Sequence, residues 1–313
     1  MEEKLLDGQA CAILSLTTRI CWSEDLPQPF SRPMAWRMIE SGALQGLVLR
    51  EVPGIDMQWL QRAQALLGRI GAVYECIEAY KKAGYSLLLP GRANWPRALG
   101  VLGTQTPLFL FAKGNLKMLN ARRIAVAGSR AILRETKNAA ACTGRLIAQE
   151  GMTLVSGGAV GVDRAAQCGA LEAGGNVVIV PAMTDAQVLA QKNISEALKQ
   201  GRLLLLCDTL PDEPFSAQKA LMRNHTIYAL GEAGLVVAAR EGAGGSWRGA
   251  TDCLRGGWRP VYVWDGDNAD TAGNRALCTL GARGYSLEKR LSDQITGCEQ
   301  VSLFGQAGGT RCV

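Results

Sequence analysis

Histidine is almost missing from this sequence, because His225 is the single one in 313 residues. A Ser-His-Asp triad or a histidine-rich metal site would have to use that residue, and we predict no metal site. Long apolar runs are missing as well, since no run approaches the roughly 18 residues of a membrane-spanning helix. The first ten residues have no basic segment ahead of an apolar stretch. We therefore predict neither a membrane span nor a signal peptide.

Paired cysteine motifs are also lacking. The ten cysteines are scattered along the chain and none forms a C-x-x-C pair. A chain of this length is too long for a disulfide scaffold. We predict that the cysteines are reduced and mostly buried as small apolar residues, which is typical of a cytoplasmic protein.

Two common nucleotide-binding signatures are missing. The glycine turn at 128–130 reads G-S-R and not G-x-G-x-x-G. No acidic residue stands at the end of the next predicted strand, where it would hold a ribose. The same turn has no G-K-[ST] of a Walker loop. We therefore predict no nicotinamide cofactor, and we assign no other cofactor to the chain.

The composition that remains is that of a globular, mildly basic protein. Hydrophobic residues make up 48% of the chain, which is enough for a sizeable core, and the net charge is +6. The length suggests one large domain or two ordinary ones. The positive charge is compatible with a nucleic-acid partner.

The chain divides into a helical beginning and an alternating middle. Residues 1–83 carry apolar residues at helical spacing and predict a small helical N-terminal domain. Over 84–266 strands and helices alternate, and the strands are near-continuous apolar runs. This pattern predicts an α/β fold with a doubly wound parallel sheet, an extended Rossmann fold. The less regular residues 267–313 are assigned to a C-terminal extension.

Three glycine-containing segments follow predicted strands: AGSR at 127–130, SGGAVGVD at 156–163 and EGAGGSW at 241–247. The carboxyl ends of parallel strands meet at one edge of a sheet, so these segments should share one crevice. Each can direct backbone N–H groups at an anion, phosphate above all. The alternative is that the glycines only permit tight turns. The predicted phosphate contacts in these segments include Gly128, Ser156, Gly245 and Ser246.

Basic and aromatic residues accompany the three segments. Eight basic residues and three acidic ones lie in 117–164, and Arg130 and Lys137 follow the first segment. Trp247 lies beside the third segment, where its ring could stack on a base. These residues favour DNA, held mainly through its phosphates, as the partner.

Several ordered motifs resemble those of one known protein family. WPRALGVLGTQTPLFLFAKGNLKML followed by RRIAVAGSR resembles the entry to that family's Rossmann domain. LVSGGAVGVDRAAQCGALEAGGNVVIV resembles its S-G-x-A-x-G-I-D-x-x-A-H stretch. PFSAQKALMRNHTIYALGEAGLVVAAREGAGGSW resembles its F-x-x-R-N-R-I-I-x-x-L-S stretch and the G-S-G-S loop after it. The family is that of the DNA-processing proteins called DprA or Smf, and the resemblance covers residues 85–265.

The resemblance implies an extended Rossmann fold, binding of single-stranded DNA and dimerisation. In competence proteins it also implies loading of a recombinase. The DNA contacts that it implies here are Ser129, Arg130, Lys137, Gly157, Gly158, Gly161, Arg223 and Asn224.

Four departures from the family pattern indicate a divergent branch: Val160, Gln167, His225 and Trp247 stand where the family has other residues. We therefore predict a DprA-like protein that binds single-stranded or locally opened DNA, in DNA processing, repair or phage defence.

Two alternatives use the same crevice. A DNA N-glycosylase needs a carboxylate near an oxocarbenium-like sugar, and Asp163 and Glu241 stand at suitable strand ends. Trp247 would then stack on a flipped base. In the structural alternative Asp163 is a helix N-cap and Glu241 a solvated loop acid. The other alternative is a nucleotide-sensing module without a polymer substrate.

The tail segment EQVSLFGQ contains Gln300, Leu303 and Phe304 and resembles the Q-x-x-L-F peptide by which bacterial replication and repair proteins bind the sliding clamp. Leu303 and Phe304 would enter an apolar pocket while Gln300 hydrogen-bonds at its rim. The alternative is a last edge strand packed on the core.

Overall fold

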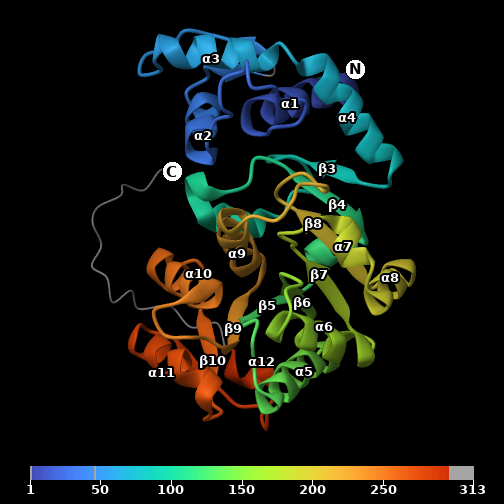
Figure 1. Ribbon diagram of the computed structural model, residues 1–313, viewed down its shortest axis with the longest axis vertical. Coiled ribbons are helices and arrows are strands. Elements are labelled where there is room, and N and C mark those ends of the chain that lie inside the picture. The colour runs from blue at the N-terminus through green and yellow to red at the C-terminus, as the bar shows by residue number, and fades with distance from the viewer. Residues whose placement is uncertain (1, 46, 296–313) are drawn as a thin grey trace.

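The computed structural model describes residues 2–45 and 47–295 as a helical N-terminal part and a larger α/β part (Figure 1). The N-terminal part has four helices and one short hairpin. These elements are α1 (Glu2–Thr17), α2 (Arg32–Glu40), β1 (Leu44–Gln45), β2 (Val48–Leu49), α3 (Met57–Leu67) and α4 (Ile70–Lys82).

The α/β part is built on a 9-stranded sheet with the order β11-β10-β9-β5-β6-β7-β8-β4-β3. Neighbouring strands are parallel from β11 to β8, whereas β4 and β3 add an antiparallel edge. The strands are β3 (Ser86–Leu88), β4 (Leu110–Gly114), β5 (Arg123–Gly128), β6 (Thr153–Ser156), β7 (Asn176–Ile179), β8 (Leu203–Cys207), β9 (Ala233–Ala238), β10 (Val261–Trp264) and β11 (Arg283–Tyr285). The predicted doubly wound α/β fold is confirmed.

Helices cover both faces of this sheet (Figure 1). On β5, Ile124 and Val126 belong to the core that α5 and α6 cover, while Ala125 between them packs in a second core with Ile227 of α9. This alternation follows from the two-residue period of a strand, and it explains why the strands are apolar throughout. The helices and 3-10 turns are η1 (Arg97–Gln105), η2 (Leu116–Asn120), α5 (Arg134–Gln149), α6 (Val162–Glu172), α7 (Asp185–Leu189), α8 (Lys192–Lys199), α9 (Ala217–Leu230), α10 (Gly244–Gly256), η3 (Ala269–Thr271), α11 (Ala272–Thr279) and α12 (Leu291–Gln294).

The N-terminal helices lie against the antiparallel edge of the sheet (Figure 1). Their apolar core continues into the α/β part through Phe111 of β4 and Leu210. Polar contacts join the same surfaces: Arg32 of α2 forms an ion pair of 3.0 Å with Asp208, and Trp36 Nε1 donates to the carbonyl of Thr106 at 2.8 Å. The helical part is therefore fixed to the sheet by both apolar and polar contacts.

Residues 267–295, which the sequence analysis assigned to an extension, continue the sheet. Strand β11 pairs in parallel with β10, so Trp264 lies beside Tyr285, and both side chains enter the main core. A crossover through α11 connects the two strands, as in the preceding units. The predicted boundary at 266 thus falls between two strands of one sheet. Over residues 2–45 and 47–295, no helix combines the length and the apolar character needed to cross a membrane.

Candidate nucleic-acid interface

The loops that follow β5, β6 and β9 meet at a pocket of about 870 Å³ beyond the carboxyl ends of these strands. The first and third loops and the start of α9 form most of its wall. Nine predicted site residues line it: Gly128, Ser129, Arg130, Asp163, Arg223, Asn224, Gly245, Ser246 and Trp247. Six others are not among its lining residues: Lys137, Ser156, Gly157, Gly158, Gly161 and Glu241.

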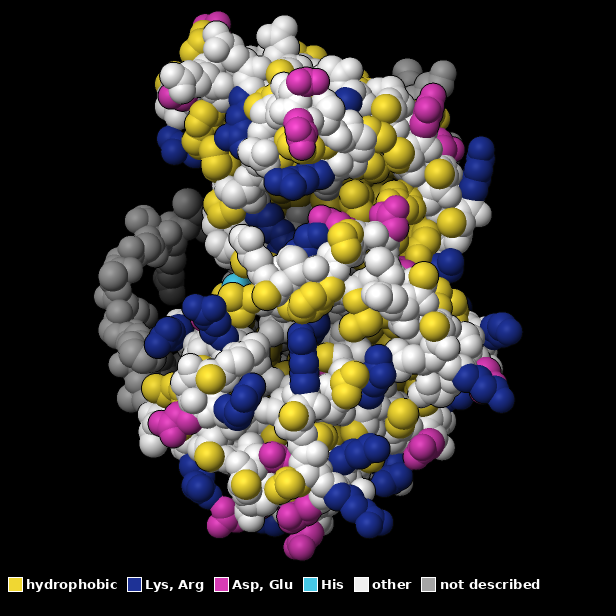
Figure 2. Space-filling model, viewed as in Figure 1, with side chains coloured by type: hydrophobic (Ala, Val, Ile, Leu, Met, Phe, Trp, Pro, Cys, Tyr) yellow, Lys and Arg dark blue, Asp and Glu magenta, His cyan; other side chains and the backbone are white. Residues whose placement is uncertain are grey.

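The described residues that line the pocket are strongly positive. Arg130, Arg223, Arg240 and Arg248 contribute four guanidinium groups, and Asp163 is the only acidic residue in this described lining. Figure 2 shows Lys and Arg side chains spread over this face of the α/β part, with Asp and Glu mainly toward its lower end and sides. A concave surface with this charge attracts anions.

Asp163 holds the second loop together instead of facing the pocket as a free acid. Its Oδ2 accepts hydrogen bonds from the backbone N–H groups of Gly157 at 3.1 Å and Ala159 at 3.3 Å. Ser156 is buried, and its hydroxyl accepts a bond of 2.6 Å from Gln167 Nε2. These contacts use donors that a phosphate would need, so the second loop mainly supports its neighbours.

Two glycines of the second loop are required by protein contacts. Gly161 has a φ of +95°, and a Cβ there would overlap the backbone oxygens of Ser129 and Arg130 in the first loop. A Cβ on Gly157 would overlap the guanidinium of Arg223. The structural alternative therefore accounts for these two positions, since the loops could not approach each other with larger residues.

Arg223 is the buried cation of the pocket. Only 5% of it is exposed, its guanidinium lies against Gly157, and its Nε has no hydrogen-bond partner among the described residues. A turn later on α9, Thr226 donates to Asp208 at 2.8 Å, which fixes the helix. A buried donor without an acceptor is costly. Because Arg223 lines the pocket, an anion bound there would lie against its charged side chain.

Burial and neighbouring charges shift the pKa values of Arg223 and of the nearby Asp163 in opposite directions. Burial lowers the pKa of the Arg223 guanidinium, and the charges of Asp163 and Asp208 raise it. Burial raises the pKa of the Asp163 carboxyl, while Arg223 and the amides of Ala159 and Gly157 lower it. Because the ordinary pKa of an arginine guanidinium is far above neutral pH, we infer that Arg223 stays charged.

Two aromatic rings flank the cations. Phe215 is 49% exposed, and the Arg130 guanidinium lies 5.4 Å from the centre of its ring. Trp247 is half-buried at the start of α10. The exposed Phe215 ring beside a cation is a stacking platform for a base, whereas Trp247 packs partly against the core. The pocket thus offers contacts for both the phosphate and the base of a nucleotide.

The third loop takes its shape from glycine and from α9. Gly242 and Gly244 both have positive φ angles, and Asn224 Nδ2 donates to the carbonyl of Gly245 at 3.1 Å. Asn224 thus ties the loop to the helix that carries Arg223. Glu241 of this loop is exposed, away from the pocket lining, and Asp163 is bound to its own loop.

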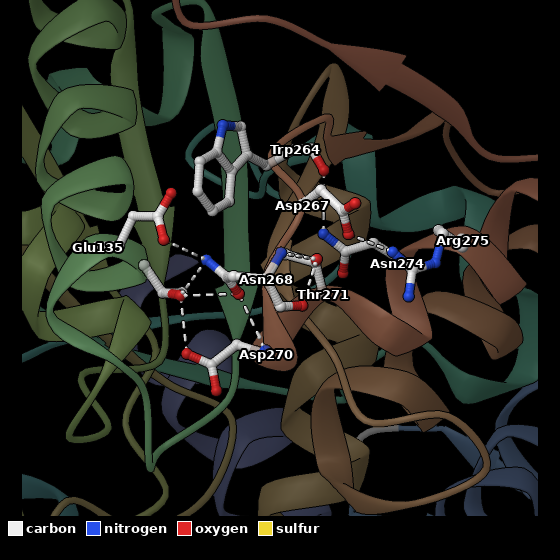
Figure 3. A network of polar contacts seen from close by, with 9 residues as sticks. Glu135, Trp264, Asp267, Asn268, Asp270, Thr271, Asn274 and Arg275 are labelled. Atoms are coloured by element: carbon white, nitrogen blue, oxygen red, sulfur yellow. Dashed lines mark hydrogen bonds and ion pairs between the residues drawn. The ribbon is translucent and has the colours of Figure 1, made fainter.

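The N-terminus of α5 already holds a carboxylate. Asp270 Oδ2 accepts from the backbone N–H of Leu133 at 2.6 Å and from the Thr136 hydroxyl at 2.7 Å, within the polar network of Figure 3. Leu133, at the N-cap of α5, offers no side-chain acceptor, and Asp270 satisfies the amide of Leu133 from outside the helix. The negative charge of this carboxylate disfavours a phosphate at the same end of α5. Lys137 is exposed on the same helix, outside the pocket lining.

His225 is a residue of α9, and its side chain contacts α10. Its Nε2 is 3.1 Å from Asp252 Oδ2, and its ring packs against Trp258 at 4.7 Å. In the described part of the chain, His, Cys, Asp and Glu form no group of three that could hold a metal ion.

Among the lining residues that sequence reasoning missed, three carry a charge or an aromatic ring. Phe215, Arg240 and Arg248 all line the pocket. Phe215 is an apolar residue in the otherwise polar connection PDEPFS, and the two arginines flank the third loop. The position of Phe215 before a helix was a usable signal, whereas the direction of the arginine side chains depends on tertiary packing.

Comparison with known proteins agrees with this geometry. The family model of DNA recombination-mediator protein A matches residues 86–296. The chain belongs to this family. It is 26% identical over 231 residues to the DNA processing protein DprA of Bacillus subtilis (strain 168), covering 72% of this chain and 76% of that protein.

Two solved DprA structures share the architecture. That of DprA from Streptococcus pneumoniae has a TM-score of 0.64 at 21% identity and covers 85% of this chain and 99% of its own. That of DNA processing protein A from Helicobacter pylori, described for its single-stranded DNA binding mode, has a TM-score of 0.56 at 25% identity. It covers 67% of this chain and 94% of its own. The predicted DprA-like family and Rossmann-type fold are confirmed, and none of these matches supports a glycosylase or a role in phage defence.

Proposed function

We propose that this protein binds single-stranded DNA and that the pocket between the first and third glycine loops is where it holds one nucleotide of the strand. The buried Arg223, with a donor that lacks a partner among the described residues, carries this proposal. The charges of Asp163 and Asp208 offset part of the cost of burying this guanidinium, and an anionic ligand in the pocket would offset more of it. A relative from Helicobacter pylori binds single-stranded DNA. This relative is the reason for proposing single-stranded DNA, and not a free nucleotide, as the ligand.

The other lining residues divide the contacts between phosphate and base. Arg130, Arg240 and Arg248 are exposed at the pocket and would bind the phosphates on either side of the held nucleotide. Phe215 and Trp247 would stack on bases. A volume of about 870 Å³ lies within the range of ligand pockets.

Lys137 and the second loop would act at a distance from the held nucleotide. Lys137 is exposed on α5, which starts after the first loop, so it would contact the backbone of the strand as it leaves the pocket. Gly157 would keep Arg223 in place and Gly161 would keep the first loop in place, as their close approaches suggest, whereas a Cβ on Gly158 would lie 3.1 Å from the Ile179 side chain.

Fluorescence anisotropy with a labelled 20-mer of deoxythymidine tests the proposal. We expect Arg130→Ala to weaken binding, because it removes an exposed cation of the pocket. The matched control is Arg122→Ala, since Arg122 is an exposed arginine paired with Glu232 away from the pocket. Equal affinities of the two variants would contradict the proposal. Competition by a mononucleotide as strong as by the oligonucleotide would favour the nucleotide-sensing alternative instead.

Two partner proposals depend on the family resemblance and the sequence of the tail. The first is a homodimer, which light scattering of the full chain would detect as a doubled mass. The second is a sliding clamp bound through Gln300, Leu303 and Phe304, which lie outside the described residues. A peptide of residues 299–305 titrated against a bacterial clamp tests it, and an absence of binding would contradict it.

A further inference from the structure

Two cysteines of the N-terminal part lie side by side in the structure. In the sequence both precede the residues that line the pocket. The Sγ atoms of Cys21 and Cys76 are 3.3 Å apart, although the residues are 55 positions apart in the chain. Cys21 is exposed and Cys76 half-buried. The expectation that the cysteines are mostly buried was wrong, since only three of the eight described ones are.

The backbone at Cys21 is held in an unusual conformation. Its φ of +50° is the only positive one outside glycine among the described residues. Such a conformation is strained for a residue with a Cβ, and it persists where surrounding contacts impose it. The buried Arg69 supplies these contacts, because its guanidinium donates to the carbonyls of Ile20 at 2.6 Å and Thr18 at 2.7 Å. The turn is thereby fixed with the Cys21 sulfur against Cys76.

The two sulfurs differ in their surroundings. Burial, the hydrogen bond with Cys21 and the charges of nearby groups raise the pKa of the Cys76 thiol to about 11. Cys21 is the more exposed sulfur, and the positive charge of Arg69 acts on it. An exposed thiol beside a fixed cation and a second thiol is the arrangement of a redox-sensitive cysteine with its resolving partner.

We propose that Cys21 and Cys76 form a reversible disulfide when the protein meets a hydroperoxide. The Cys21 thiolate attacks one oxygen of hydrogen peroxide, the O–O bond breaks, and the other oxygen leaves as hydroxide and takes up a proton to form water. The Cys76 sulfur then attacks the sulfenic sulfur of Cys21 and the S–O bond breaks. The Cys76 proton leaves with that hydroxide as a second water. The two sulfurs lose two electrons, which reduce the peroxide.

The geometry requires only a local adjustment. The sulfurs must approach by about 1.2 Å to reach the length of a disulfide bond, a change within the reach of side-chain rotation. The bond would link Cys21, in the connection between α1 and α2, to Cys76 in α4. It would close a loop between two residues that are 55 positions apart. Closing a loop of this size reduces the freedom of the unfolded chain, so the oxidised protein should melt at a higher temperature.

Peptide mapping of the full chain tests this site. The reduced protein is treated with hydrogen peroxide, alkylated and digested with trypsin without reductant. Cys21 falls in peptide 20–37 and Cys76 in peptide 70–81. We expect these two peptides to be linked, the link to disappear with dithiothreitol, and the melting temperature to rise by roughly 5 °C in the linked form.

Variants separate this pair from general cysteine oxidation. In Cys76→Ser, we expect the sulfenic acid of Cys21 to accumulate and to react with dimedone, because its resolving partner is missing. Cys278→Ser removes an exposed cysteine elsewhere and should leave the link intact. If both cysteines of the pair remain free to alkylate after peroxide, or if Cys21 links only between molecules, the proposal is overturned.

Discussion

Replacing Asp270 with alanine should destabilise the fold through α5, because this side chain caps a helix to which it does not belong. Its Oδ2 accepts from Leu133 N–H at 2.6 Å and from the Thr136 hydroxyl at 2.7 Å. Each bond contributes about 1 kcal/mol, as at an N-cap. The carboxylate adds about 0.5 kcal/mol against the helix dipole. We therefore expect the free energy of unfolding to fall by roughly 2–3 kcal/mol.

Urea denaturation followed by circular dichroism measures this loss as a lower midpoint with an unchanged slope. The matched control is Asp267→Ala, three residues earlier. Asp267 is 83% exposed and pairs with Arg275 at the surface, an arrangement that contributes little. If both variants unfolded at the same urea concentration, Asp270 would not be the cap of α5.

The remaining predictions address the second loop, the stacking surface and the cysteine pair. Gly161→Ala should destabilise the protein more than Gly174→Ala in thermal unfolding, because both glycines have positive φ but only a Cβ at 161 would meet backbone oxygens; equal losses would contradict the close approach of the loops. Phe215→Ala should weaken DNA binding by roughly 1–3 kcal/mol in anisotropy titrations without changing its salt dependence, since it removes stacking and no charge; an unchanged affinity would place the strand elsewhere. In the reduced protein, the rate of Cys76 alkylation should rise about tenfold per pH unit up to about pH 11. The reason is that the thiolate is the reacting form, and its fraction rises with pH below the raised pKa. A rate that reaches a plateau near pH 8 would contradict this pKa.

The sheet could be predicted because its signals are local. The run at 124–127 is apolar on both faces, and glycine follows the strands at the points where the structure turns into helices. The family motifs add Arg223 and Asn224, which the structure places in the pocket. The antiparallel direction of β4 and β3 was not predictable in the same way, since strand direction depends on connections and not on the strand's own residues.

The roles of the second-loop residues could not be predicted because they depend on long-range contacts. Gly161 approaches Ser129 of a different loop, and Gly157 approaches Arg223 from another helix. The structural alternative for Asp163, a helix N-cap, was wrong, because Gly161 is the N-cap of α6 and Asp163 lies in the first turn. The hydrogen bonds of Asp163 to two amides of the preceding loop follow only from the folded turn. Likewise, Asp270 lies 137 positions from Leu133, the residue whose amide it accepts.

The salt dependence of single-stranded DNA binding by Arg223→Met tests the central claim most directly. Methionine fills similar space without charge, and circular dichroism would verify that the variant folds. If Arg223 binds a phosphate, affinity should fall roughly tenfold to a hundredfold, and the slope of log K against log salt should shrink by about 0.7. Arg223→Lys should recover part of both, while Arg122→Met should change neither. A folded Arg223→Met variant with the affinity and slope of the unaltered protein would contradict the assignment of this pocket to DNA.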